Sequence, residues 1–294
     1  MRIRAFRALR PAPENVSKVA CPPYDVVDTA EAAEIARGNP LCFFHISRPE
    51  IDLRPGVDLC SDDVYAKAAD NFSRFQRKGY LTRDNELSVY VYRLIMGDHQ
   101  QTGIVSVCHI DDYNRGIIKK HEKTRKAPEE DRTRHTAALN ANAGPVFLAY
   151  RDNIGIDHLV SRLQQTPPLF DFVAPDGVRH TLWKVGRATE VVNLFAAVNC
   201  AYIADGHHRA AAAARVAELR RKANPDHRGD EEYNWFMAVL FPAGQLKIMP
   251  YNRCVRDLNG MDSDAFLKKI EGIFTVAAGA QPSPKAPTNI SMYL

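Results

Sequence analysis

One segment constrains the fold more than any other. Residues 200–204 form a short apolar run, and Asp205-Gly206 separates that run from His207-His208-Arg209 and five consecutive alanines. The run is typical of a buried strand, and alanine has the highest helix propensity of all residues. The sequence therefore predicts a strand that leads directly into a helix over residues 206–222, with Asp205 as the N-cap. A unit of this kind is typical of α/β proteins.

The rest of the chain alternates helical and strand patterns. The clearest helix covers residues 62–78, where Val64, Ala68, Phe72 and Phe75 recur at three- and four-residue spacing. A second helix is predicted from Thr29 to residue 37, with Asp28 as N-cap and Gly38 as its end. Strands are expected over residues 2–9, 42–46, 87–95, 103–110, 145–150, 182–185, 235–241 and 245–249, the last two as a hairpin. Further helices are expected over residues 190–198, 264–273 and the second half of 117–143.

These patterns predict an α/β fold with a mixed sheet. With 294 residues, the chain is long enough for one large domain or two ordinary ones. We divide it into an N-terminal α/β region over residues 1–150 and a second region over residues 151–294, which can also form one compact unit. The chain ends on the apolar run Ile290-Ser-Met-Tyr-Leu294, so we expect the natural protein to continue beyond it.

Composition excludes several classes of protein. Apolar residues make up 45% of the chain and charged residues 25%, which is the balance of an ordinary globular protein. The net charge of +4 is small and the basic residues form no long block, so a nucleic acid partner is not favoured. No cysteine pair has zinc-site spacing, and neither a signal peptide nor a membrane-spanning run is present. These features predict a cytoplasmic protein without a membrane partner.

The segment around Asp205 is also the strongest functional signal. The first N–H groups of a helix lack partners within the helix, and the helix dipole adds partial positive charge there. His207, His208 and Arg209 place three side-chain donors in that first turn, and a guanidinium suits phosphate oxygens. We therefore predict an anion site, most simply for phosphate, at Gly206 and the three residues after it. The alternative is a capped helix with solvated histidines.

A second signal is the charged run Lys119-Lys120-His121-Glu122-Lys123-Thr124-Arg125. A carboxylate among several cations stays ionised and can accept a proton from a hydroxyl or hold Mg²⁺ beside phosphates. Lys120 and His121 can neutralise phosphate charge. The alternative is a solvated charged surface. No second histidine follows at metalloprotease spacing, which excludes that chemistry.

Two further segments are better explained by structure than by chemistry. The prolines of Cys21-Pro22-Pro23-Tyr24-Asp25 predict a rigid turn, and Tyr251-Asn252-Arg253 follows a predicted strand. The common phosphate loops, the dinucleotide fingerprint, the nucleophile elbow and the kinase motifs are all missing from the sequence. A phosphate or nucleotide would therefore be bound by a less common fold.

Several segments resemble a widespread prokaryotic family, the domain-of-unknown-function family one-thousand-and-fifteen. They run in order along the whole chain, as residues 22–27, 120–124, 141–147, 203–209, 240–242 and 250–253. Separately, the element Asp205-Gly206-His207-His208-Arg209 resembles the phosphate-binding turn of the ParB/sulfiredoxin-like superfamily. That superfamily includes the free serine kinases, which carry the same element. This second resemblance implies a ParB/sulfiredoxin-like core with an additional α/β region.

Together these observations predict a phosphotransferase that acts on a small hydroxylated metabolite, with serine or phosphoserine as the first substrate to test. Gly206, His207, His208, Arg209, Lys120 and His121 would bind phosphate. Glu122, His208 and Asp205 would be catalytic, and Asp205 and Glu122 would hold Mg²⁺. ATP, ADP or pyrophosphate would donate the phosphate. The alternatives are a ParB-like nucleotide or DNA-binding module, a metal-dependent phosphatase or nuclease, and a non-catalytic sensor of a phosphorylated metabolite.

Overall fold

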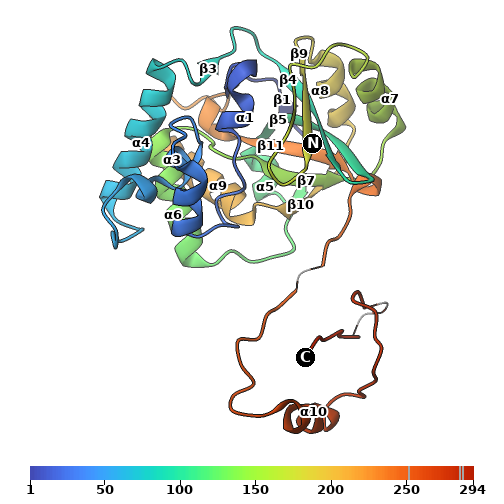
Figure 1. Ribbon diagram of the computed structural model, residues 1–294. Coiled ribbons are helices and arrows are strands. Elements are labelled where there is room, and N and C mark those ends of the chain that lie inside the picture. The colour runs from blue at the N-terminus through green and yellow to red at the C-terminus, as the bar shows by residue number, and fades with distance from the viewer. Residues whose placement is uncertain (251, 285, 287) are drawn as a thin grey trace. The chain divides into compact units, whose positions relative to one another are not determined.

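The structure, a computed structural model, describes residues 1–250, 252–284, 286 and 288–294. The chain divides into two compact units, Met1–Leu246 and Lys247–Leu294. The first unit contains the sheet and most of the helices, and the second contains one helix, α10 (Ser263–Glu271) (Figure 1). The boundary between these two compact units lies at residue 246.

The first unit alternates short strands and helices along the chain. Its strands are β1 (Ile3–Arg4), β2 (Leu9–Arg10), β3 (Thr82–Arg83), β4 (Val89–Met96), β5 (His99–His109), β6 (Ile118–Lys119), β7 (Val146–Tyr150), β8 (Phe170–Val173), β9 (Arg179–Val185), β10 (Ala201–Asp205) and β11 (Trp235–Pro242). Its α-helices are α1 (Val16–Val19), α2 (Thr29–Ala36), α3 (Phe44–Ser47), α4 (Asp62–Arg77), α5 (Ile110–Asn114), α6 (Lys126–Leu139), α7 (Ile154–Leu163), α8 (Thr189–Ala196) and α9 (His207–Ala223). Short 3₁₀ turns cover Pro13–Asn15, Pro49–Asp52, Glu232–Asn234 and Ala243–Gln245.

A nine-stranded mixed sheet forms the centre of the first unit. Eight strands follow the order β6-β10-β7-β11-β5-β4-β9-β8, and β1 pairs with β5. The pairs β6/β10 and β7/β11 are parallel, and the other pairs of this sheet are antiparallel. The prediction of an α/β protein with a mixed sheet is therefore confirmed. Strands from both sides of residue 150 alternate within this sheet.

The main core lies between the sheet and the helices α7, α8 and α9. Alternate side chains of the central strands, such as Leu148, Tyr150 and Leu240, are fully buried there. They pack against Phe195 of α8 and against the alanine run of α9. Small alanine side chains allow α9 to approach the sheet closely, so the start of this helix is held rigidly at the sheet edge.

A second layer is built from helices. Helix α4 packs on α6, and α6 packs on α9, so these three helices lie side by side (Figure 1). Their smaller core includes Ile46, Phe75 and Leu139, which are all buried. This layer places α6 against α9, the helix that follows the Asp205-Gly206 turn.

Several local predictions are confirmed. Asp28 caps α2 through a capping box with Glu31, and Gly38 follows this helix with a φ of 71°. Helix α4 buries Val64, Ala68 and Phe75 as the spacing predicts. The segment 42–46 was predicted as a strand, but its residues 44–46 belong to α3. Its N–H groups bond to helical residues and not to a strand, as in Ile46 N–H to Phe43 O at 2.9 Å and Phe43 N–H to Val19 O of α1 at 3.1 Å, because the segment packs among helices.

The predicted hairpin over residues 235–241 and 245–249 is also wrong in its second half. Strand β11 has β7 on one edge and β5 on the other, so no edge is free for a returning strand. A 3₁₀ turn at Ala243–Gln245 follows β11, and the side chain of Gln245 accepts a hydrogen bond from Thr102 N–H at 2.7 Å. None of the helices in the described part of the chain combines the length and apolar character needed to span a membrane.

Candidate functional site

The topology of the sheet brings the two charged segments together. Strands β6 and β10 are parallel, with Ala201 opposite Ile118 and Tyr202 opposite Lys119. Parallel strands end at the same edge of a sheet, so the segment after Lys119 meets the segment after Asp205 there. Lys120, His121 and Glu122 therefore lie at the start of α9, although they precede His207 by 85 to 87 positions in the sequence.

The turn into α9 differs from the predicted one. Gly206 is the N-cap and has a φ of 92°, in the left-handed region that glycine adopts at little cost. The sequence analysis predicted Asp205 as the N-cap, but Asp205 is the last residue of β10 and does not cap the helix. The reason is that its carboxylate accepts a hydrogen bond from Arg209 of the first helical turn. The first N–H groups of α9 therefore receive no side-chain cap from the N-cap residue.

Arg209 is held on one flank of β10. Its guanidinium donates to the carboxylate of Asp205 and to the carbonyl oxygen of Pro145, which precedes β7. It also lies over Gly206, because a Cβ added there would come within 3.2 Å of the Arg209 Cζ atom. Only 19% of the Arg209 side chain is exposed. A positive charge is thus fixed beside the start of α9.

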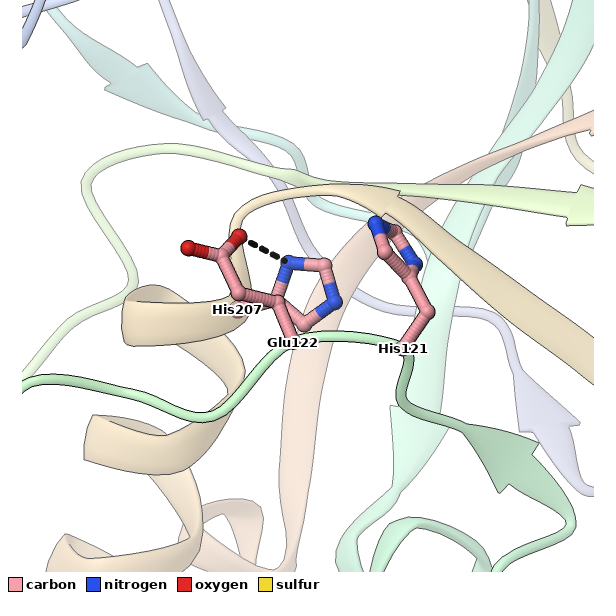
Figure 2. A group of neighbouring side chains, drawn as sticks. All are labelled: His121, Glu122 and His207. Carbon is pink, nitrogen blue, oxygen red and sulfur yellow. Dashed lines mark ion pairs between the residues drawn. The ribbon is translucent and has the colours of Figure 1, made fainter. Parts of the chain in front are cut away.

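His207 and Glu122 meet on the other flank. Nδ1 of His207 lies 3.8 Å from Oε2 of Glu122, and the His121 ring lies edge-on to the His207 ring with centroids 4.5 Å apart (Figure 2). His207 is 7% exposed, whereas His121 and Glu122 lie on an exposed segment. One buried imidazole therefore faces two groups that solvent can reach.

His207 and His208 both contain a buried nitrogen without a partner. Among the residues that the structure describes, neither Nε2 of His207 nor Nδ1 of His208 has a hydrogen-bond partner. Burial lowers the pKa of His207, and the neighbouring His121 acts in the same direction, while Glu122 and Asp205 oppose them. A neutral imidazole with an unused nitrogen is available to a ligand at neutral pH.

A pocket of about 500 Å³ opens at this place. Its lining consists of Tyr113, Lys120, His121, Glu122, Lys123, Thr124 and His207. The ammonium group of Lys120 lies 4.0 Å from the centre of the Tyr113 ring, a cation–π contact that holds the charge at the pocket wall. A second cavity of about 430 Å³ also touches Tyr113 and Thr124 and continues along α9 to Arg215 and Arg221. The two volumes are in the range of small-molecule sites.

The turn that contains Pro22 and Pro23 also contains Tyr24, which the sequence analysis did not select as a site residue. Tyr24 stacks under Arg132 of α6, whose Cζ lies 4.1 Å from the ring centre. Burial raises the pKa of the Tyr24 phenol, and the charges of Arg132 and Arg209 act against that rise. Tyr24 and Arg132 thus belong to the surroundings of Arg209. The resemblance that included residues 22–27 was the signal that could have selected Tyr24.

Three side chains could hold a metal ion. Within the described residues, His121, Glu122 and His207 form a group whose donor atoms all lie within 4.8 Å of one another. This group differs from the predicted pair of Asp205 and Glu122, because the Asp205 carboxylate is bonded to Arg209. Glu122 is common to both sets.

The structure thus divides the predicted site residues into two sets. Lys120, His121, Glu122 and His207 line one pocket, and the Asp205–Arg209 pair lies on the opposite flank of β10. Of the Tyr251-Asn252-Arg253 segment, Tyr251 lies outside the described residues, and the other two belong to the second compact unit.

Comparison with known proteins gives one finding. Neither the curated proteins nor the solved structures include a match to this chain. The model of a protein family described as "Protein of unknown function (DUF1015)" matches residues 3–294. That match includes the β6 and β10 segments, the two-proline turn and the loop before β7, which together surround the start of α9. The chain therefore belongs to the DUF1015 family.

Proposed function

We propose that the pocket at the start of α9 binds a phosphorylated small molecule and transfers its phosphoryl group to or from a hydroxyl group, with serine and phosphoserine as the first substrates to test. The observation that best supports this proposal is that Glu122 lies 3.8 Å from His207 at a helix N-terminus without a side-chain cap from its N-cap residue. Phosphoryl transfer depends on positioning and on charge stabilisation, and both are supplied there.

The anion-binding groups surround the helix start on two flanks. Arg209 provides a fixed guanidinium on the β7 flank, and Lys120 provides an ammonium group on the β6 flank. The backbone N–H groups of the first turn belong to the helix start itself, as does Nε2 of His207, which has no hydrogen-bond partner within the described residues. A phosphate has enough oxygens to accept from groups of both kinds.

Glu122 is the carboxylate that the pocket offers to an acceptor hydroxyl. In the transfer, the hydroxyl oxygen forms a bond to phosphorus, the bond from phosphorus to the bridging oxygen of the donor breaks, and the hydroxyl proton leaves. Glu122 assists either by accepting that proton or by holding a cation that lowers the pKa of the hydroxyl. ATP, ADP and pyrophosphate all contain the phosphoanhydride bond that this step requires, and Mg²⁺ would accompany them.

The resemblance of Asp205-Gly206-His207-His208-Arg209 to the phosphate-binding turn of the free serine kinases supports the same proposal. A second candidate function is a metal-dependent phosphatase. It is favoured by the group His121, Glu122 and His207, since two imidazoles and one carboxylate form a common metal-binding set.

The test is ³¹P NMR of the purified protein with Mg²⁺ and L-serine, with ATP, ADP or pyrophosphate added in turn, and with O-phosphoserine alone. Formation of phosphoserine supports the transferase, and release of phosphate from phosphoserine supports the phosphatase. The variant Arg209→Ala should lower the rate by roughly 10²–10³, the usual loss for one donor to a developing oxyanion.

A matched control is Arg162→Ala, which removes an exposed arginine of α7 that pairs with Glu190 of α8. Its rate should equal that of the wild type. No reaction in any tube, or an unchanged rate in the Arg209→Ala variant, would contradict the proposal.

A further inference from the structure

We infer that His121, Glu122 and His207 form a binding site for one transition-metal ion such as Zn²⁺, Mn²⁺ or Co²⁺. The inference builds on the proposed phosphoryl-transfer site, because it gives Glu122 the role of a metal ligand there. It also replaces the predicted Mg²⁺ ligands Asp205 and Glu122 by a different set.

The first argument is the geometry of the three donors. Their ligand atoms all lie within 4.8 Å of one another, and Nδ1 of His207 lies 3.8 Å from Oε2 of Glu122. Ligands that bind one ion at about 2.0–2.2 Å are separated by roughly 3–3.5 Å. The group therefore needs to contract by about 1 Å to coordinate an ion.

The second argument is that the contraction is mechanically simple. His207 is fixed, since it lies in the first turn of α9 and is 93% buried. His121 and Glu122 are adjacent in an exposed segment between β6 and α6, outside any helix or strand. One short segment can thus bring both ligands to the fixed imidazole (Figure 2).

The third argument is charge. A carboxylate and two neutral imidazoles carry one negative charge for a divalent ion. Lys120, a cation that lines the same pocket, is drawn to the face of the Tyr113 ring at 4.0 Å. Arg209 is bonded to Asp205 and Pro145 on the other flank of β10. Neither cation is therefore bonded to the Glu122 carboxylate in this structure, and that carboxylate keeps its oxygens for a metal.

The donor types select the class of ion. Imidazole nitrogens suit Zn²⁺, Mn²⁺, Fe²⁺ and Co²⁺, whereas Mg²⁺ prefers oxygen ligands and keeps several waters. Three protein ligands leave a coordination position open, as in catalytic metal sites. Because the site lies in the pocket of about 500 Å³, that position faces the space where a phosphate or hydroxyl oxygen would enter.

The test is a titration of the metal-free protein with Co²⁺, followed by its visible spectrum, and with Zn²⁺ in competition with a chromophoric chelator. It is performed with Cys60→Ser and Cys254→Ser present, because these exposed thiols can bind both ions. We expect one equivalent to bind. Each of the variants His121→Gln, Glu122→Gln and His207→Gln should weaken binding by roughly 100-fold or more, at least the loss known for changes in the outer shell.

Two controls match these variants. Arg125→Gln changes an exposed residue at the end of the same segment, outside the pocket lining, and His158→Gln removes an exposed histidine of α7. Both should bind Co²⁺ as the wild type does, and a tenfold excess of Mg²⁺ should not displace it. Equal affinity in the three ligand variants and the controls would overturn the inference, as would full displacement by Mg²⁺.

The outcome is separable from that of the proposed function. His121→Gln changes an exposed side chain, so loss of metal binding in this variant cannot be assigned to misfolding if its thermal unfolding matches that of the wild type. Metal binding at the three residues without any phosphoryl transfer would contradict the function and leave the metal site. Equal phosphoryl transfer by wild type and His121→Gln, together with equal Co²⁺ affinity, would overturn the metal site and leave the function.

Discussion

Two regions of the molecule place histidines near carboxylates, and they differ in how the imidazole nitrogens are used. In the helical layer, His45 bonds to Asp52 through Nδ1 at 2.9 Å and to the carbonyl of Asn39 through Nε2 at 3.1 Å. At the start of α9, the nearest carboxylate to His207 is 3.8 Å away, and Nε2 is without a partner within the described residues. A histidine with both nitrogens bonded holds structure together, whereas one with an unused nitrogen is available to a ligand.

His135 is a buried histidine of the helical layer with one ring nitrogen bonded to the backbone, and it gives the largest expected effect on stability. It lies on α6 with Nε2 2.9 Å from the carbonyl oxygen of Ile46. Burial lowers its pKa to about 4 from an ordinary value of 6.5, and the charge of Arg132 adds to this, while the Ile46 bond and Asp131 oppose it. Between these two pH values the unfolded chain binds a proton that the folded chain does not, so stability falls as the pH decreases.

We expect this group to remove up to about 3 kcal/mol from the free energy of unfolding between pH 6.5 and pH 4, and no more below that range. The measurement is urea unfolding at several pH values for the wild type and for His135→Gln. The difference between the two curves should narrow as the pH falls. The control is His158→Gln, and curves for His135→Gln that run parallel to the wild type would contradict the prediction.

A substitution of Asn71 in the same helical layer should cause a smaller loss of stability. This fully buried side chain donates to the carbonyl of His45 at 2.6 Å and to the carboxylate of Asp52 at 2.8 Å. Asn71→Ala leaves both acceptors short of a donor, so the free energy of unfolding should fall by about 1–3 kcal/mol. Chemical denaturation measures this, with Asp70→Ala, an exposed neighbour on α4, as the control. Equal losses in the two variants would show that the buried network adds no stability.

The smallest change in the free energy of unfolding is expected at the start of α9, and its sign is opposite to that of the two changes above. His207→Leu removes a buried nitrogen that lacks a partner among the residues the structure describes, so the free energy of unfolding of the metal-free protein should stay the same or rise by less than about 1 kcal/mol. His135→Leu is the matched change in the helical layer and should be destabilising. A loss of more than about 2 kcal/mol in His207→Leu would show that this imidazole is structural, which would remove the distinction between the two regions.

Local sequence signals predicted the elements that depend on local physics. Helix α4 follows from its apolar spacing, α2 from the Asp28 cap, and the β10–α9 unit from a strand pattern before an alanine run. The predictions of secondary structure were wrong where contacts with neighbouring helices and strands determine the backbone conformation. Residues 42–46 are mostly apolar, as in a short buried strand, but pack among helices, and residues 245–249 have no free strand edge beside them because β5 and β7 already pair with β11.

By itself, the sequence determined the chemistry at the start of α9, because a glycine that tolerates a left-handed backbone, a strong helix former and three donors are local properties of residues 205–214. Only the tertiary structure decided what that chemistry faces. The parallel pairing of β6 with β10 brings Glu122 and His121 to His207, and the pairing of β7 with β10 brings Pro145 to Arg209. Strand pairing is a long-range interaction that no local pattern encodes, so the sequence listed these groups without indicating which of them meet.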